Sequence, residues 1–286
     1  MKSFLLSILF SALVLIPALV SGTDDSTLYV KTIYQHEIFN GRNTARKAAI
    51  KLEMRDATGE LFRESYFNAN TKAEEYILYY YYNADKTIRL VEKNNPLEQL
   101  IEYYTYNYKK GKLQNIKHYQ YQADTKTSSL MDTRNYIRKK NTLTIHSQNA
   151  GGVSLKTEVI TYNKMQEIRN EITNHLADSA YKTIFNFEYN DTLLTNKYET
   201  IISKNQDSIK YWHNYIYNAA NQLEKINTYL LPANEKIHFY TVFKYMPGGS
   251  LENERRVNGT NDFYLYNYTT KYTVYTRQLP RKDPVF

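Results

Sequence analysis

The segment from Tyr211 to Tyr217 holds the residues best suited to contact a ligand, because the one Trp of the chain lies there among Tyr, His and Asn. If the segment is a strand, its side chains alternate, so Trp212 and Asn214 lie on the face opposite the Tyr and His side chains. A Trp ring beside amide groups is an ordinary surface for a sugar ring to stack on. The alternative is that Trp212 packs against a neighbouring strand. The predicted binding site is Tyr211, Trp212, His213, Asn214 and Tyr215.

Patterns typical of catalysis or metal binding are weak in this sequence. The six His residues are isolated along the chain, at His36, His118, His146, His175, His213 and His238. No two have the His-x-x-x-His spacing of a zinc site, and the chain has no Cys. We find no nucleophile elbow, phosphate-binding loop or dinucleotide fingerprint. We therefore predict no metal, no cofactor and no enzymatic activity. The alternative is an envelope glycan hydrolase with two carboxylates from distant segments.

The first 22 residues have the form of a secretory signal peptide. Lys2 precedes an apolar run from Phe4 to Ile16, and the small residues Ser21 and Gly22 follow. The run is too short for a permanent membrane span, and without Cys there is no site for a lipoprotein anchor. We predict a secreted or periplasmic protein cleaved after Gly22, with no transmembrane anchor. An uncleaved anchor is the alternative.

The charge balance is basic. The formal net charge of +8 becomes +7 when Lys2 leaves with the signal peptide. Such a balance attracts polyanions, and export argues against nucleic acid, so an envelope polysaccharide or another anionic surface is the expected partner. The charges are interspersed, which is more typical of a solvated surface than of a dedicated anion site.

A repeated unit organises most of the chain. Two large residues lie two positions apart, turn formers follow, and an apolar residue opens the next segment, as in Tyr215, Tyr217 and Leu223. Large residues two apart share one strand face, and Asn, Asp and Gly suit tight turns, so each unit predicts one β-hairpin. The central residues recur 21 to 30 positions apart. They are Met54, Tyr82, Tyr106, Tyr136, Tyr162, Tyr189, Tyr217, Tyr245 and Tyr266.

The flanking positions of the unit support the same interpretation. The residues two before the centres are Leu52, Tyr80, Tyr104, Arg134, Ile160, Phe187, Tyr215, Phe243 and Tyr264, of which Arg134 alone breaks the pattern. The apolar residues after the turns are Leu61, Ile88, Leu113, Leu143, Ile168, Leu193, Leu223, Leu251 and Tyr272. In one segment, from Met165 to Ala177, the apolar residues lie four positions apart, so a helix is the alternative to a strand there. Its Thr-, Asn- and Tyr-rich flanks favour a strand, which we predict.

The repeats predict an all-β fold. Nine hairpins supply roughly sixteen to eighteen strands, and twisted sheets of more than about ten strands tend to curl, split or close. We predict a long curved antiparallel sheet, a meander of repeated hairpins that is rolled up or partly closed. A closed barrel and a two-layer sandwich stay open as alternatives. The 30 Tyr residues suit a thin layer whose inner face is partly hydrated.

The motif Tyr-x-Tyr-Asn, a short turn and Leu-x-x-Ile, as in Tyr104 to Asn107 with Leu113 and Ile116, resembles the YD repeat of the RHS family. The resemblance extends over roughly residues 50 to 276. Most copies lack the Asp that follows the second Tyr in that family, and its self-cleavage core and toxin cargo have no match here. The resemblance implies β-sheet strips at cell surfaces that wrap or bind other molecules.

The predicted organisation is a signal peptide at 1–22, a leading hairpin at 23–50, the repeat domain at 51–276 and a disordered tail at 277–286. We predict an exported, non-catalytic β-repeat protein with a binding or structural role at the cell envelope and a glycan as the candidate ligand. Besides the hydrolase, a carrier of an apolar ligand inside a rolled sheet is an alternative.

Overall fold

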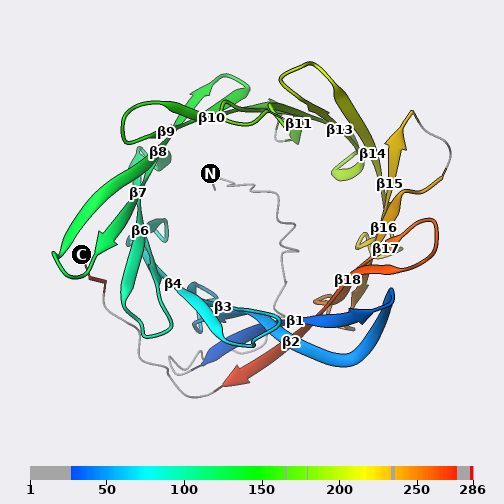
Figure 1. The fold of residues 1–286 in the computed structure, drawn as a ribbon, viewed down its shortest axis with the longest axis horizontal. Coiled ribbons are helices and arrows are strands. Elements are labelled where there is room, and N and C mark those ends of the chain that lie inside the picture. Colours follow the sequence, from blue (N-terminus) through cyan, green and yellow to red (C-terminus); the bar gives the residue numbers. More distant parts are fainter. Residues whose placement is uncertain (1–26, 165, 179, 233–235, 276–283, 286) are drawn as a thin grey trace.

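The protein is a barrel of eighteen antiparallel strands (Figure 1). The computed structural model describes residues 27–164, 166–178, 180–232, 236–275 and 284–285; the predicted signal peptide and most of the predicted tail lie outside them. In the described residues, no helix is long and apolar enough to cross a membrane.

The strands follow one another around the ring in chain order. They are β1 (Leu28–Phe39), β2 (Arg42–Arg55), β3 (Leu61–Phe67), β4 (Glu74–Tyr82), β5 (Ile88–Asn94), β6 (Leu100–Lys109), β7 (Lys112–Gln122), β8 (Thr127–Lys139), β9 (Thr142–Asn149), β10 (Ser154–Asn163), β11 (Gln166–Asn174), β12 (Lys182–Asn190), β13 (Leu193–Ile202), β14 (Ser208–Tyr217), β15 (Leu223–Leu231), β16 (Phe239–Tyr245), β17 (Leu251–Asn258) and β18 (Tyr264–Tyr275). The all-β prediction and the strand prediction at β11 are confirmed.

The sheet closes completely, whereas the sequence predicted a sheet that was rolled up or only partly closed. β18 pairs with β1 from Leu28 opposite Tyr275 to Gln35 opposite Tyr268, so the first and last strands complete the ring. Closure supplies hydrogen-bond partners to the two strands that would otherwise be sheet edges. The strand twist that accumulates over eighteen strands brings those edges together.

The ring surrounds a wide lumen. Eighteen strands about 4.8 Å apart have a circumference of about 86 Å, hence a backbone diameter of about 27 Å before strand tilt widens it. Barrels with this number of strands leave room for an aqueous channel. The inner wall is therefore a surface that a ligand can reach.

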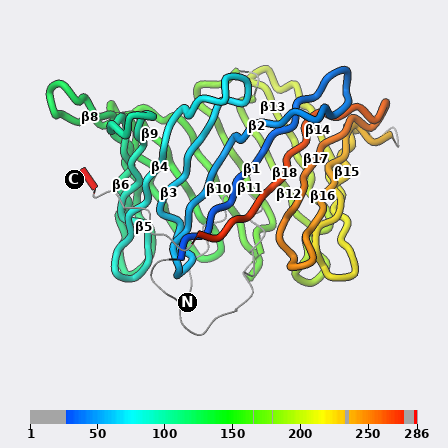
Figure 2. The backbone as a smooth tube through the Cα atoms, turned by 90° about the horizontal axis from the view of Figure 1, so that it is seen from below, coloured from blue at the N-terminus to red at the C-terminus, as the bar shows by residue number. Residues whose placement is uncertain are grey.

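The pleat assigns each side chain to the lumen or to the outside. The segment of residues 284–285 lies outside the ring in Figures 1 and 2, and Val285 donates its backbone N–H to Glu92 at 2.7 Å, so Glu92 faces outward. The next residue, Val91, then faces the lumen together with its cross-strand partners Tyr80 and Tyr104. Following the registers around the ring places the large residues of most repeats, including Tyr215 and Phe243, on the lumen face.

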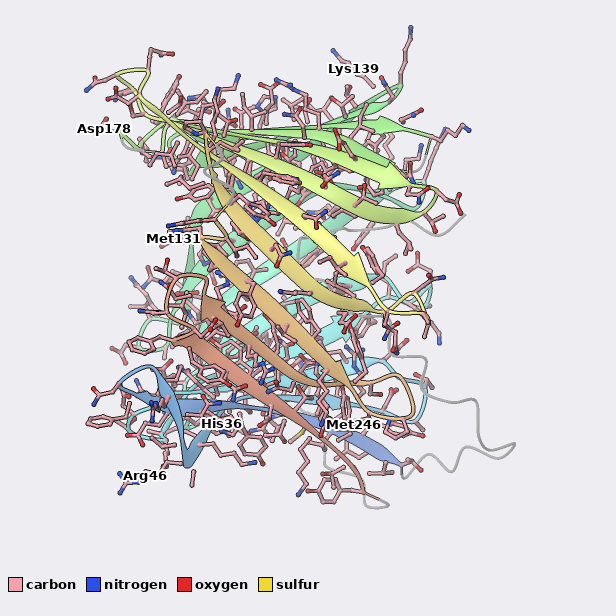
Figure 3. All side chains as sticks on the ribbon, turned by 90° about the vertical axis from the view of Figure 1, so that its right-hand side faces the viewer. His36, Arg46, Met131, Lys139, Asp178 and Met246 are labelled. Carbon is pink, nitrogen blue, oxygen red and sulfur yellow. The ribbon has the colours of Figure 1, made fainter. Side chains whose placement is uncertain are left out.

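Because consecutive strands are antiparallel, the turns alternate between the two ends of the barrel. In Figure 3, Arg46 and Asp178 lie toward one end, and Lys139 and Met246 toward the other. We call the second end the bulge rim, since the turns that follow β2, β4 and each later even strand through β16 lie there. Every hairpin at this rim except β8/β9 contains a β-bulge next to its turn.

The bulge is the physical basis of the sequence repeat. In five hairpins the predicted central Tyr is the first residue after the bulge, and it pairs with the first lumen-facing residue of the return strand, as Tyr217 does with Leu223. The inserted residue raises the local twist, and the Tyr ring covers the lumen side of the distorted ladder. In β6 this place belongs to Tyr108, two residues after the predicted Tyr106.

Five predicted repeat residues are wrong, and one of them is Leu193, because Leu194 lies opposite Tyr189. Leu52 and Met54 face outward, because the residue after the bulge in β2 is Arg55, and they pack with Phe62. Tyr266 lies within the unbroken strand β18 and has no hairpin turn after it. Ile168 is the extra residue of its bulge and is 37% exposed, so Glu167 takes the place opposite Tyr162.

The outer face carries two small apolar clusters. Leu28, Val30 and Phe62 form one of them. Leu90, Leu100 and Tyr103 form the other, near the contact between Val285 and Glu92. The wall there is buried on the outside, although the sheet is a single layer.

Candidate functional site

The predicted site at Tyr211 to Tyr215 is divided by the wall of the barrel. Cross-strand registers in β13, β14 and β15 place Tyr211, His213 and Tyr215 in the lumen and Trp212 and Asn214 outside. One ligand cannot contact both sets. They are therefore two separate surfaces.

The outer half is a packed row of side chains. Trp212 stacks on Tyr229 with ring centroids 4.7 Å apart and planes at 20°. Its indole Nε1–H donates to Asn196 Oδ1 at 2.9 Å, and Asn214 donates to the same oxygen at 3.3 Å. One face of the indole and its donor are thus occupied within the wall, as the packing alternative expected.

The inner half is a hydrogen-bonded ion cluster. His213 contacts Thr228 Oγ1 at 2.9 Å through Nδ1 and Glu199 Oε2 at 3.2 Å through Nε2, and Lys197 lies 3.6 Å from Glu199. Burial favours a raised pKa for Glu199, but the hydrogen bond from His213 and the Lys197 charge outweigh it, so the pKa lies below its usual value. Burial also raises the pKa of Tyr215. These groups satisfy one another and hold the wall together.

Across the ring, a second ion cluster lies in the lumen wall around Glu64. Lys51 Nζ lies 2.6 Å from Glu64 and 3.1 Å from Glu53. The hydroxyls of Tyr80 and Tyr66 donate to the same Glu64 oxygen at 2.7 and 3.0 Å. Burial together with the Glu64 charge raises the pKa of Tyr66 to about 12. Tyr in this part of the wall supplies donors to buried carboxylates.

A recurrent bond, which we call the tyrosine tie, joins successive hairpins at the bulge rim. A lumen Tyr hydroxyl donates to the backbone carbonyl of the first lumen-facing residue of the preceding hairpin's return strand. The ties are Tyr82 to Leu61 at 2.6 Å, Tyr217 to Leu194 at 2.9 Å, Tyr245 to Leu223 at 2.9 Å and Tyr272 to Leu251 at 3.5 Å. Each tie anchors one hairpin to the next.

The tie is missing over one arc of the wall. Among the described residues, the hydroxyls of Tyr108, Tyr136 and Tyr162 have no hydrogen-bond partner, and burial is the main cause that raises the pKa of each. These three Tyr side chains line a recess of about 740 Å³ in the lumen wall. It extends over β7 to β11 and reaches the β4/β5 and β6/β7 turns at the bulge rim.

The recess combines charge with an apolar floor. Its cations are Lys86, Arg134, Arg138 and Lys156, and its carboxylates are Asp132 and Glu158. Ile145, Ile160 and Ile172 are among its apolar residues. Sequence reasoning missed this site, because its members come from segments that become neighbours through strand pairing alone.

Glu167 lies in the wall beside the recess, at the position where the six other hairpins with a bulge at this rim have Leu or Ile. It is 6% exposed, and its Oε1 has no hydrogen-bond partner among the described residues. Burial raises the pKa of Glu167 to about 7; the Asn170 amide and Lys197 oppose the shift, and the Glu158 charge adds to it. Alignment of the bulges would have identified this exception, but the apolar Ile168 beside it obscured the register.

No group of three or more His, Asp or Glu side chains that could hold a metal ion occurs in the described part of the chain. His118 and His213 each contact carboxylates in the lumen wall. His146 and His175 both lie near the Thr157 hydroxyl on the outer face. Most of the His side chains thus have polar partners within the sheet.

No family model matches the sequence, and no curated protein is significantly similar to it. Among solved structures, the chain is similar to a porin-like protein from Bacteroides vulgatus ATCC 8482, at 8% identity and a TM-score of 0.39, covering 85% of this chain and 97% of the other. It is also similar to a porin-like protein from Bacteroides uniformis ATCC 8492, at 10% identity and a TM-score of 0.27, covering 87% and 97%.

A third similar structure, of TcdB2-TccC3, has 11% identity and a TM-score of 0.16, and the match covers 73% of this chain but 15% of that one. At such low values a site cannot be transferred from one protein to another.

Proposed function

We propose that this protein is an exported, non-catalytic barrel of the cell envelope that binds a glycan in its lumen. The observation that carries the proposal is the lumen wall itself, where Tyr rings alternate with charged pairs around a lumen wide enough for an aqueous channel. Examples of the pairs are Lys93 with Glu102 at 3.1 Å and His118 with Asp132 at 2.8 Å. Aromatic rings and fixed polar groups together suit polyhydroxylated ligands, because a sugar has apolar C–H faces and many hydroxyls.

The composition of the outer face supports a barrel surrounded by water. On β11, the outward-facing Glu171 lies 2.7 Å from Arg169 of the same strand and 2.6 Å from Lys182, the first residue of β12. Lys117 and Arg255 also point outward from the middle of their strands. A barrel embedded in lipid presents an apolar band there, and charged side chains are costly in such a band.

A binding test with matched variants examines the proposal. The mature chain from residue 23 would be titrated by calorimetry against a panel of envelope oligosaccharides at low salt. Tyr106→Ala removes a lumen ring, and Tyr198→Ala removes an outer ring opposite Trp212. We expect saccharide binding that Tyr106→Ala weakens and Tyr198→Ala leaves unchanged. Failure of every oligosaccharide to bind would leave a structural role.

A glycan hydrolase is the second candidate, because Asp132 and Glu158 both line the recess. Both carboxylates have partners: Asp132 contacts His118, and Glu158 lies 3.3 Å from Lys156. These contacts occupy both carboxylates, whereas a glycosidase needs an acid and a base that face each other across the scissile bond. Release of reducing ends from the bound oligosaccharides, abolished by Glu158→Gln, would favour the hydrolase over the binding protein.

A further inference from the structure

The lumen wall uses its Tyr hydroxyls in two ways. Where the tyrosine tie is made, as at Tyr217 and Tyr245, the hydroxyl is held by a backbone carbonyl. Where the wall forms the recess, Tyr108, Tyr136 and Tyr162 have hydroxyls without a partner among the described residues. These hydroxyls face the recess and are available as donors to a ligand.

The charges of the recess do not balance. Three of its cations have carboxylate partners: Lys86 lies 3.8 Å from Glu60, Arg134 lies 3.8 Å from Asp132, and Lys156 lies 3.3 Å from Glu158. Arg138 makes no ion pair with a described residue, and it lines the recess together with Tyr162. A guanidinium beside free phenol hydroxyls matches the geometry of a carboxylate or another oxyanion.

A buried acceptor adds a second requirement on the ligand. Asn170 is 2% exposed and lines the recess; its Nδ2 donates to Glu158 at 2.9 Å, whereas its Oδ1 has no donor within the described chain. An unsatisfied buried amide oxygen is costly unless a donor reaches it. A ligand hydroxyl would satisfy it.

The floor of the recess restricts the choice further. Ile145, Ile160 and Ile172 offer an apolar surface several carbons wide. The C–H face of a pyranose ring fits such a floor, and its hydroxyls and a ring carboxylate can then meet Asn170 and Arg138. A simple fatty acid would leave the amide oxygen and the three Tyr hydroxyls without partners.

We propose that this recess is the binding site for an acidic sugar unit, with Arg138 as the carboxylate partner, Tyr162 and Tyr136 as hydroxyl donors, and Asn170 as the acceptor of a sugar hydroxyl. The proposal rests on the proposed glycan-binding function and names its substrate class. Arg138 determines specificity for acidic over neutral rings, because charge-assisted hydrogen bonds are the strong ones.

The test compares two ligands that differ in the carboxylate alone. Trigalacturonate and the neutral trisaccharide of galactose would be titrated into the mature protein, and laurate would serve as an apolar anion. We expect trigalacturonate to bind at least about tenfold more tightly than the neutral trisaccharide. Arg138→Gln should remove that preference, and Tyr162→Phe should weaken both saccharides. Arg255→Gln, which removes an outward-facing cation, should change neither.

The outcomes separate the two proposals. If saccharides bind and Tyr106→Ala weakens them but Arg138→Gln has no effect, glycan binding in the lumen stands and the recess assignment is overturned. If neither trisaccharide binds, the acidic-sugar assignment is overturned, whereas glycan binding in the lumen fails only when no oligosaccharide of the panel binds. If laurate binds more tightly than trigalacturonate, the recess is a site for an apolar anion and the acidic-sugar assignment is wrong.

Discussion

The same hairpin repeat has different roles in two arcs of the ring. In the arc from β12 to β18, successive hairpins are joined by tyrosine ties, and the residue opposite the Tyr is Leu194, Leu223 or Leu251. In the arc from β6 to β11 the described residues make no such tie, a recess opens, and Glu167 occupies one of the Leu positions. A hairpin repeat can thus close the wall or leave polar groups for a ligand, depending on the partner of one hydroxyl.

The largest effect is expected when a Glu like Glu167 is placed in the arc from β12 to β18, where tyrosine ties join the hairpins. Leu223→Glu places a carboxylate at the buried position opposite Tyr217. We expect a loss of about 3 kcal/mol or more in the free energy of unfolding, since an apolar contact is replaced by a buried polar group. Urea denaturation measures it. Leu230→Glu on the same strand, where Leu230 is 45% exposed, should cost much less.

The reverse exchange should stabilise the untied arc. Glu167→Leu restores the apolar residue of the other hairpins and removes a buried carboxyl whose Oε1 has no partner within the described residues. We expect a gain of about 1–2 kcal/mol near pH 8, because an unsatisfied buried polar group is removed. If the gain is absent, another group satisfies Glu167 and the contrast between the arcs is weaker.

The same variant should change the pH dependence of stability. The pKa of Glu167 is raised to about 7 in the folded protein, so its neutral form is favoured there. The stability linked to this group is complete below the ordinary Glu pKa of about 4.5 and is lost as pH rises toward 7. The parent should therefore lose melting temperature relative to Glu167→Leu as the pH rises from 4.5 to 8, so the difference between the two proteins grows steadily. Glu224→Leu, at an exposed bulge position of β15, should show no such separation.

Removal of single hydroxyls sharpens the comparison on a smaller scale. Tyr217→Phe deletes the tie to Leu194 and should cost about 1 kcal/mol. Tyr162→Phe deletes a hydroxyl that makes no hydrogen bond to a described residue and should cost close to nothing. Equal losses in urea denaturation would show that the tie does not distinguish the arcs.

The smallest effect is expected at the outer wall of the tied arc. Trp212→Phe keeps an aromatic ring to stack on Tyr229 but loses the donor to Asn196. We expect a loss of about 0.5–1 kcal/mol and unchanged saccharide affinity. A large loss of affinity would place the glycan site outside the barrel, on the predicted Trp surface.

The sequence predicted the strands because the repeat has a local cause. Large residues two apart, turn formers and an apolar return residue all arise within one hairpin, as at Tyr215, Tyr217 and Leu223. The position of the bulge was harder to predict from the sequence, because shifting the pairing by one residue moves a side chain to the other face of the sheet. Met54 and Ile168 were misassigned for this reason.

Closure and the recess depend on contacts that a local pattern does not encode. β1 and β18 meet across nearly the whole described chain, and Arg138 approaches Tyr162 through strand pairing. The predicted site at Tyr211 to Tyr215 was correct about alternation, but a single sequence does not tell which face is concave. YD-type repetition remains an interpretation of the motif.

The pairing of β1 with β18 has a consequence for how the chain matures. The residues that pair there, such as Leu28 and Tyr275, are at opposite ends of the polypeptide, so the seam forms only after all eighteen strands have emerged. Until then the nascent sheet carries two bare edges that can pair with another copy, and long-range pairings of this kind form slowly. The last strand, β18, is therefore the one that removes both edges at which another copy could pair.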